Sequence, residues 1–205
     1  IILSSITIAL FLTFTAFQNI ESKVVDSARD KISLLNRAYN GEILKVKDDL
    51  NQTFRNLTTF GSKNLTNMLS YKEKTILIRN QLTRRNYELY SNSVLAIVDE
   101  NGYVLGETGD GGASSRIDRE GFRANVSNAD NDVKTSYFSK IDDKIYTRVI
   151  VRYSNESSRK LYLVLTLPVD EEVMKNLAVL SSLGEDDKVF LVVDEKYKLG
   201  TFNLK

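Results

Sequence analysis

The residues best suited to chemistry in this sequence are basic and aromatic side chains that alternate along one predicted strand. In "KIYTRVIVRYS" (residues 144–154), Tyr146, Arg148 and Arg152 share a face with Ile150, because successive side chains of a strand point to opposite faces. The other face carries residues suited to a core, namely Ile145, Thr147, Val149, Val151 and Tyr153. An arginine fork beside a tyrosine hydroxyl suits recognition of a small anion. The competing interpretation is that Arg148 and Arg152 form ion pairs with surface carboxylates.

The sequence lacks two residue types that are common in catalytic sites. The 205 residues include no His and no Cys, which removes the commonest general base, the commonest metal ligand and all thiol chemistry. No calcium-loop pattern is present, and "GETGDGG" lacks the GK[ST] ending of a phosphate loop. The acidic clusters fall in predicted turns: Asp99-Glu100, Asp142-Asp143 and Glu185-Asp186-Asp187. We therefore expect no enzyme, no cofactor and no metal site in this segment.

The charge balance argues against a nucleic-acid partner. Lys and Arg number 28 and Asp and Glu number 27, giving a net charge of +1, whereas a nucleic-acid interface requires a clustered basic excess. Hydrophobic residues make up 42% of the chain, which is ample for a core in one large domain or two small ones.

The first 17 residues, "IILSSITIALFLTFTAF", contain no charged residue. As a helix they would span roughly 25 Å, slightly less than the ~30 Å hydrocarbon core of a bilayer. We predict a truncated transmembrane helix over residues 1–17. Three alternatives fit less well. A cleaved signal peptide would need a small-residue cleavage site, and this sequence offers no convincing one. A type IV pilin would carry glutamate where Ser5 stands. A buried helix of a soluble protein would rarely have so many consecutive uncharged residues.

A helical period then replaces the unbroken apolar run. Between residues 28 and 57 the apolar spacing averages about 3.6 residues, which predicts an amphipathic helix that passes through Asn40-Gly41. A helix of ~40 residues would be about 60 Å long. Such a stripe needs a partner, either the following domain or a second copy of the helix. Gly61-Ser62 is the expected break, and residues 67–90 predict a further helix. The stripe consists of Ala28, Ile32, Leu35, Tyr39, Ile43, Val46, Leu50, Phe54, Leu57 and Phe60.

The phrase "VLAIVDENGYVLGET" (residues 94–108) recurs as "VFLVVDEKYKLGT" (residues 189–201). Each copy predicts a β-hairpin, and the continuous apolar run implies a strand covered on both faces. Between the two copies we expect a short helix over residues 119–125 capped by Asp118. Three strands (133–140, 144–154 and 160–168) and a helix over residues 169–184 should follow.

This order resembles a PAS-like sensor of the Cache superfamily, the extracytoplasmic domains of bacterial histidine kinases, chemoreceptors and diguanylate cyclases. The residues that carry the resemblance are the hairpin "VLAIVDENGYVLGETGD", the strand ending "LVLTLP" and the exit helix leading to "KVFLVVDEKYKLGT". The implied fold is α+β, with a long N-terminal helix packed on a PAS-like antiparallel sheet and the start of a second similar unit. The expected domains are the transmembrane helix, sensor helices over 18–91, a Cache unit over 92–183, and a linker with a truncated second unit over 184–205. The alternative is that the second hairpin only extends the first sheet.

The resemblance also implies a function. Cache sensors bind a small molecule between the sheet and the short helices, which here corresponds to Arg116, Phe122, Tyr137, Tyr146 and Arg148. We therefore expect the ligand-sensing region of a receptor in the inner or plasma membrane, with its globular part extracytoplasmic. The expected partners are a small-molecule ligand, for which an anion is one candidate, and a second copy of the chain in a homodimer formed through the long helix. The alternative is a ligand-free scaffold or dimerisation domain.

Overall fold

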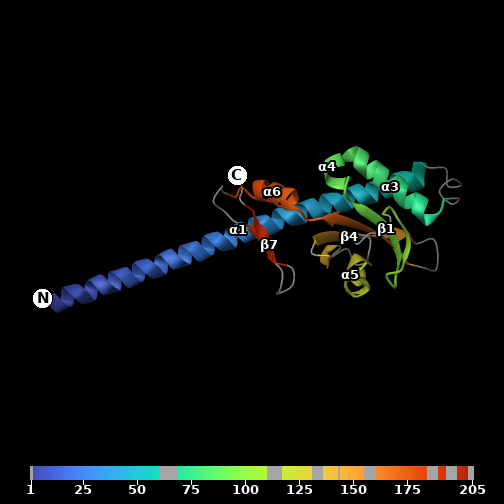
Figure 1. Cartoon of the computed structure of the whole chain (residues 1–205). Coiled ribbons are helices and arrows are strands. Elements are labelled where there is room, and N and C mark those ends of the chain that lie inside the picture. The colour runs from blue at the N-terminus through green and yellow to red at the C-terminus, as the bar shows by residue number, and fades with distance from the viewer. Residues whose placement is uncertain are drawn as a thin grey trace.

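The chain forms an α+β fold in which one very long helix packs on a five-stranded antiparallel sheet (Figure 1). The computed structural model describes residues 2–60, 69–109, 117–130, 136–142, 144–154, 160–183, 189–192 and 198–202. The order of elements matches the expectation: long helices, two strands, a short helix, three strands, a helix and a second hairpin. The predicted fold class is therefore confirmed.

Helix α1 (Ile2–Phe60) is continuous over 59 residues. It passes through Gly41, as predicted, and nothing lies within 4 Å of the place where a Cβ would stand at that position. Its N-terminal half projects away from the rest of the chain (Figure 1). Among the residues described, no helix meets the length and hydropathy needed to cross a bilayer. The expected break at Gly61-Ser62 lies outside the described residues.

The single helix expected over residues 67–90 is in fact two, because the chain breaks at Asn86. Helix α3 (Tyr71–Arg85) begins with a reciprocal capping box between Ser70 and Glu73. Asn86 has an extended backbone (φ −149°, ψ 95°), and its side chain caps α4 (Tyr87–Tyr90) by accepting from the Leu89 amide. A residue that caps the next helix with its own side chain favours a turn over a helix interior, so the prediction of one helix was wrong.

The sheet has the strand order β2-β1-β5-β4-β3, and each pair is antiparallel. Strands β1 (Val94–Asp99) and β2 (Val104–Glu107) form the predicted hairpin. Its turn closes through the Asp99 carboxylate, which accepts from the amides of Asn101 and Tyr103, with Gly102 at φ +83°. The other strands are β3 (Ser136–Ile141), β4 (Lys144–Ser154) and β5 (Leu161–Pro168). The bounds of β4 are those predicted from sequence.

Two further helices and a small sheet complete the structure. Helix α5 (Arg119–Asp130) starts where predicted but continues five residues beyond Asn125. Helix α6 (Glu171–Leu180) is shorter than the predicted residues 169–184 because Asp170 has an extended backbone and caps its first turn. Strands β6 (Val189–Val192) and β7 (Lys198–Phe202) pair in a sheet of their own and do not extend the first one.

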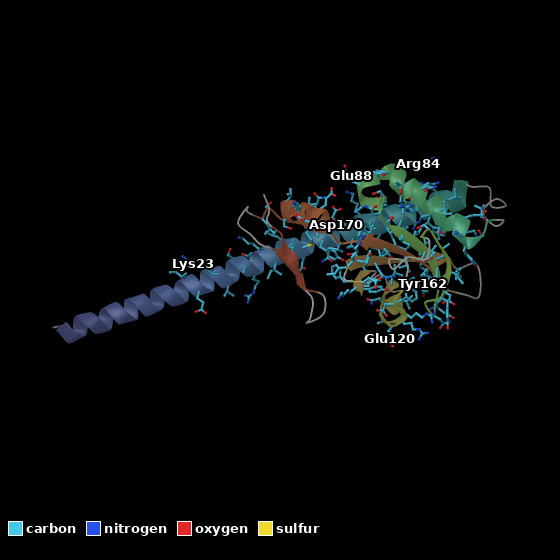
Figure 2. All side chains as sticks on the ribbon, viewed as in Figure 1. Lys23, Arg84, Glu88, Glu120, Tyr162 and Asp170 are labelled. Atoms are coloured by element: carbon cyan, nitrogen blue, oxygen red, sulfur yellow. The ribbon has the colours of Figure 1, made fainter. Side chains whose placement is uncertain are left out.

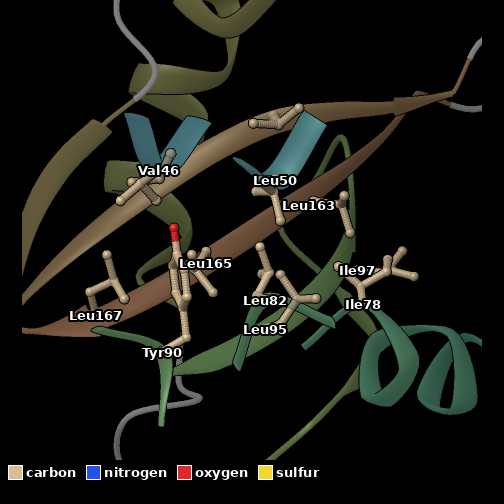
Figure 3. Close-up of a cluster of buried hydrophobic side chains, with 12 residues drawn as sticks. Val46, Leu50, Ile78, Leu82, Tyr90, Leu95, Ile97, Leu163, Leu165 and Leu167 are labelled. Carbon is tan, nitrogen blue, oxygen red and sulfur yellow. The ribbon is translucent and has the colours of Figure 1, made fainter. Parts of the chain in front are cut away.

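The main hydrophobic core lies between α1 and the sheet. Val46 and Leu50 of α1, Ile78 and Leu82 of α3, and Tyr90 of α4 pack on alternate residues of the central strands (Figure 3). Leu50 is fully buried, and Phe54 is half-buried against the same cluster. The partner of the predicted stripe is therefore the sheet from about Leu35 onward. Further toward the N-terminus the stripe is exposed, with Ile32 at 60% and Val24 at 62%.

This register gives a direct test by core truncation. Leu50→Ala should lower the free energy of unfolding by about 3 kcal/mol, because it opens a cavity in a closely packed site. Leu44→Ala, on the same helix but 58% exposed, should change it by less than about 0.5 kcal/mol. Chemical denaturation of the two variants measures the difference, and equal losses would contradict the register.

Candidate functional site

The second face of the sheet forms a separate layer, covered by α5. Phe122 of α5 is fully buried among Ala96 and Val98 of β1, Ile150 of β4, and Tyr162 and Val164 of β5. Its ring meets that of Tyr162 edge to face with 5.8 Å between centroids, a favoured aromatic geometry. Figure 2 labels Tyr162 and Glu120, which mark this layer on the side of the sheet away from α3.

Arg148 is the largest fully buried side chain among the described residues. It stands on the α5 side of β4, directly opposite Tyr137 on β3 and Thr166 on β5. Its Nε donates to Ser139 Oγ at 2.7 Å. Burial lowers the pKa of the guanidinium, and the nearby Tyr137, Asp118 and Tyr146 oppose that shift. A buried positive charge is costly unless polar groups surround it. The polar groups near Arg148 reduce that cost.

Tyr137 presents a buried hydroxyl that has no hydrogen-bond partner in the structure. Burial is the main reason that its pKa rises to about 12, with Asp118 adding to the shift and Arg148 opposing it. The hydroxyl therefore stays protonated at neutral pH and remains a hydrogen-bond donor. A buried polar group without a partner is rare in folded proteins and calls for an explanation.

The first turn of α5 closes one side of this cluster. The Asp118 carboxylate accepts from the Glu120 amide at 3.1 Å, which confirms its predicted capping role. At Gly121 an added Cβ would collide with that carboxylate and come within 3.3 Å of the Tyr137 ring. Glycine thus allows the N-terminus of α5 to lie directly on β3. The hairpin turn holds the same helix from the other side, since Arg119 lies over the Tyr103 ring at 4.3 Å.

The structure brings four of the five predicted site residues to this one layer. Phe122, Tyr137, Tyr146 and Arg148 all lie on the α5 side of the sheet, and Arg116 lies outside the described residues. Arg148 is fully buried, whereas Arg152 on the same strand is exposed. The competing interpretation, that both arginines form ion pairs with surface carboxylates, stays a prediction.

Sequence reasoning missed Ser139 and Thr166 and gave Asp118 only a capping role. The signal for Ser139 was present. Asp142 has φ +47°, and Ile141 pairs with Lys144. Counting back along that hairpin places Ser139 opposite Tyr146, one step from Arg148 on the same face. The position of Thr166 opposite Arg148 could not be predicted in this way. Six residues, 155–160, separate β4 from β5, and a connection of that length leaves the register of the two strands open.

The cluster combines the positive charge of Arg148, the hydroxyl donor of Tyr137 and the hydroxyl of Ser139, with the Asp118 carboxylate nearby. The first three groups together can hold an anionic group such as a carboxylate. No protein-family model matches this sequence, and no curated protein is similar enough to count as a relative. The chemistry of this cluster is therefore the basis for the function proposed below.

Removal of one oxygen atom tests the state of the Tyr137 hydroxyl. In the ligand-free protein, Tyr137→Phe should leave the free energy of unfolding unchanged or raise it by up to about 1 kcal/mol, because it removes a buried donor without a partner. A loss above about 1 kcal/mol in denaturant unfolding would show that the hydroxyl is hydrogen-bonded.

The wild type and Tyr137→Phe should differ in free energy of unfolding at alkaline pH. The pKa of Tyr137 is raised from 10.0 to about 12 on folding. The contribution of the protonated hydroxyl to the free energy of unfolding is therefore fully present below pH 10 and is lost as pH rises toward 12. The wild type should therefore lose stability relative to Tyr137→Phe only within that window. Because the other tyrosines are common to both proteins, their ionisation cancels in the comparison.

Proposed function

We propose that this chain is the ligand-sensing region of a bacterial membrane receptor, such as a histidine kinase, chemoreceptor or diguanylate cyclase. In this proposal it binds a small anionic molecule at the Arg148 cluster on the α5 face. The observation that carries the proposal is the buried, unpartnered hydroxyl of Tyr137 beside the buried charge of Arg148. A bound carboxylate would accept the Tyr137 hydrogen while the positive charge of Arg148 holds it.

The location of the cluster supports a role in signalling. Arg148 faces α5, whereas its chain neighbours Thr147 and Val149 face α1. Thr147 Oγ1 lies 3.4 Å from the Tyr39 hydroxyl of α1, and Val149 belongs to the core with Val46 and Leu50. A ligand that shifts β4 would therefore alter the surface on which α1 rests. Such a ligand signals only if it binds one arrangement of α1 more tightly than another.

The projecting half of α1 supports the membrane and dimer parts of the proposal. Its apolar residues Ile20, Val24 and Ile32 recur at helical spacing and are 61%, 62% and 60% exposed, and the uncharged run of residues 1–17 precedes them. An exposed apolar stripe on a long helix is the seam along which two copies associate. In this proposal the N-terminal run anchors the chain in the inner or plasma membrane, with the globular part extracytoplasmic.

Anion binding is tested on two arginines of the same strand and the same face. A thermal-shift screen of organic acids first finds a ligand, since binding at 100-fold Kd adds about 2.7 kcal/mol to stability. Arg148→Gln should then weaken binding of that acid at least about tenfold, or 1.4 kcal/mol. The exposed Arg152, replaced by Gln, is the matched control and should retain affinity.

Failure would take two forms. If no organic acid shifts the melting temperature, the ligand-free scaffold becomes the better account of the fold. If an acid binds but Arg148→Gln and Tyr137→Phe both leave its affinity unchanged, the ligand lies elsewhere. Tyr137→Phe keeps the test informative should Arg148→Gln fail to fold.

Self-association is tested by placing a charge in the proposed seam. Ile32→Glu should shift the protein from dimer toward monomer, with a dimer dissociation constant raised at least about tenfold, because the carboxylate would be buried against its own copy. Leu44→Glu, at a similarly exposed position outside the stripe, should leave it unchanged. Sedimentation equilibrium of both variants measures the effect, and a monomeric wild type would remove the dimer from the proposal.

A further inference from the structure

A groove of about 390 Å³ lies on the opposite side of the sheet from the Arg148 cluster. Its walls come from α1, α4 and α6, and the ends of β4 and β5 close its base through Thr147 and Leu167. Figure 1 shows α4 and α6 on the same side of α1, and Figure 2 labels two of the lining residues, Glu88 and Asp170. The volume falls within the range of small-molecule sites, and the sequence analysis did not anticipate it.

Much of the lining of the groove is apolar, and it includes one aromatic ring. The apolar and aromatic side chains that the helices contribute include Tyr39, Ile43 and Val46 of α1, Leu89 of α4, and Val173 and Leu177 of α6. Tyr39 is held in place by stacking on Phe138 at 5.2 Å and by contact of its hydroxyl with Thr147. At the outer edge, Val179 and Leu180 are 74% and 58% exposed. An apolar body would therefore find a preformed surface.

All the charged residues that line the groove are acidic. Glu42 of α1, Glu88 of α4, Glu172 of α6 and the capping Asp170 contribute four carboxylates, and no Lys or Arg is among the described lining residues. Lys45, outside the lining, lies 4.0 Å from Glu42. Asp170 uses Oδ1 to cap α6. The carboxylates surround the rim without converging, since no three acidic side chains of the described residues could share a metal ion. The described lining residues thus carry only negative charge, which Lys45 partly offsets at Glu42.

From these observations we propose that the groove binds an organic cation, an ammonium or guanidinium group on an apolar or aromatic body. The apolar body would lie on Tyr39, Val46 and Leu177, and the cation would face Glu88 and Glu172. The Tyr39 ring adds a surface that attracts cations. Because the occupant would touch α1, α4 and α6 together, its binding would fix α6 relative to α1. The proposal is independent of the anion site on the other face.

Benzylammonium is a suitable probe, with benzoate and benzyl alcohol as the anionic and neutral molecules of similar shape. Calorimetric titration of the whole chain should show saturable binding of benzylammonium, weaker binding of benzyl alcohol and none of benzoate. The affinity should fall as salt is raised, because the carboxylates are exposed. Equal binding of all three compounds, or no binding of benzylammonium, would overturn the proposal.

Two neighbouring glutamates of α6 provide matched variants. Glu172→Gln removes a carboxylate from the groove and should weaken benzylammonium about twofold, and about fivefold when combined with Glu88→Gln. Glu171 lies next to it on the same helix but outside the groove and pairs with Lys175 at 2.9 Å. Glu171→Gln should leave the affinity unchanged, and an equal loss in both variants would show only a general charge effect and overturn the site.

The last controls separate this site from a protein interface and from the anion site. Asn176→Trp places a large side chain at the groove wall and should abolish benzylammonium binding without unfolding the protein. If it instead breaks a dimer seen by sedimentation in a wild type that does not bind benzylammonium, the groove is covered by a second copy and the proposal is wrong. Arg148→Gln should leave benzylammonium affinity unchanged, so either site can fail without the other.

Discussion

The burial of one stripe of α1 against the sheet is the interaction on which the other features depend. Leu50 and Val46 insert between Leu95, Leu163 and Leu165 of the sheet and close the core with α3 and α4. Each buried aliphatic side chain contributes about 1.5–3 kcal/mol. Without this contact the sheet would expose one apolar face, and α1, which also contacts α3 and α6, would lose its contact with β4. The position of α1 on the sheet then determines where α6 can pack, and hence where the groove lies.

The second face of the sheet is the place where apolar packing gives way to charge. Around Phe122 and Tyr162 the layer is apolar and includes Ile150 of β4. Two residues away on β4, the same face buries Arg148 with Tyr137 and Ser139. An aliphatic residue at position 148 would be easier to bury. The buried Arg148 and the unpartnered Tyr137 hydroxyl therefore lower the stability of the layer relative to apolar side chains. The same two groups are the ones that the proposed ligand would contact.

Strand β4 connects the two proposed sites. Thr147 contributes to the base of the groove on one face, and Arg148 forms the centre of the anion cluster on the other. Two ligands of opposite charge would therefore act on successive residues of one strand. If each prefers a particular setting of β4 against α1, their affinities must be coupled, and the coupling must be equal in both directions.

Local patterns in the sequence determined much of this architecture. Alternation predicted β4 and its two faces, the acidic pair at 142–143 predicted the division between β3 and β4, and Asp118 predicted the start of α5, because each depends on neighbours within a few residues. Only the tertiary structure decided that Arg148 is fully buried, that the chain breaks at Asn86, and that a groove opens beside α6. These features depend on contacts between distant segments, such as Tyr39 with Thr147, 108 residues apart. Period and turn chemistry carry no information about which helix covers which part of a sheet, since that is set by the packing of complementary surfaces.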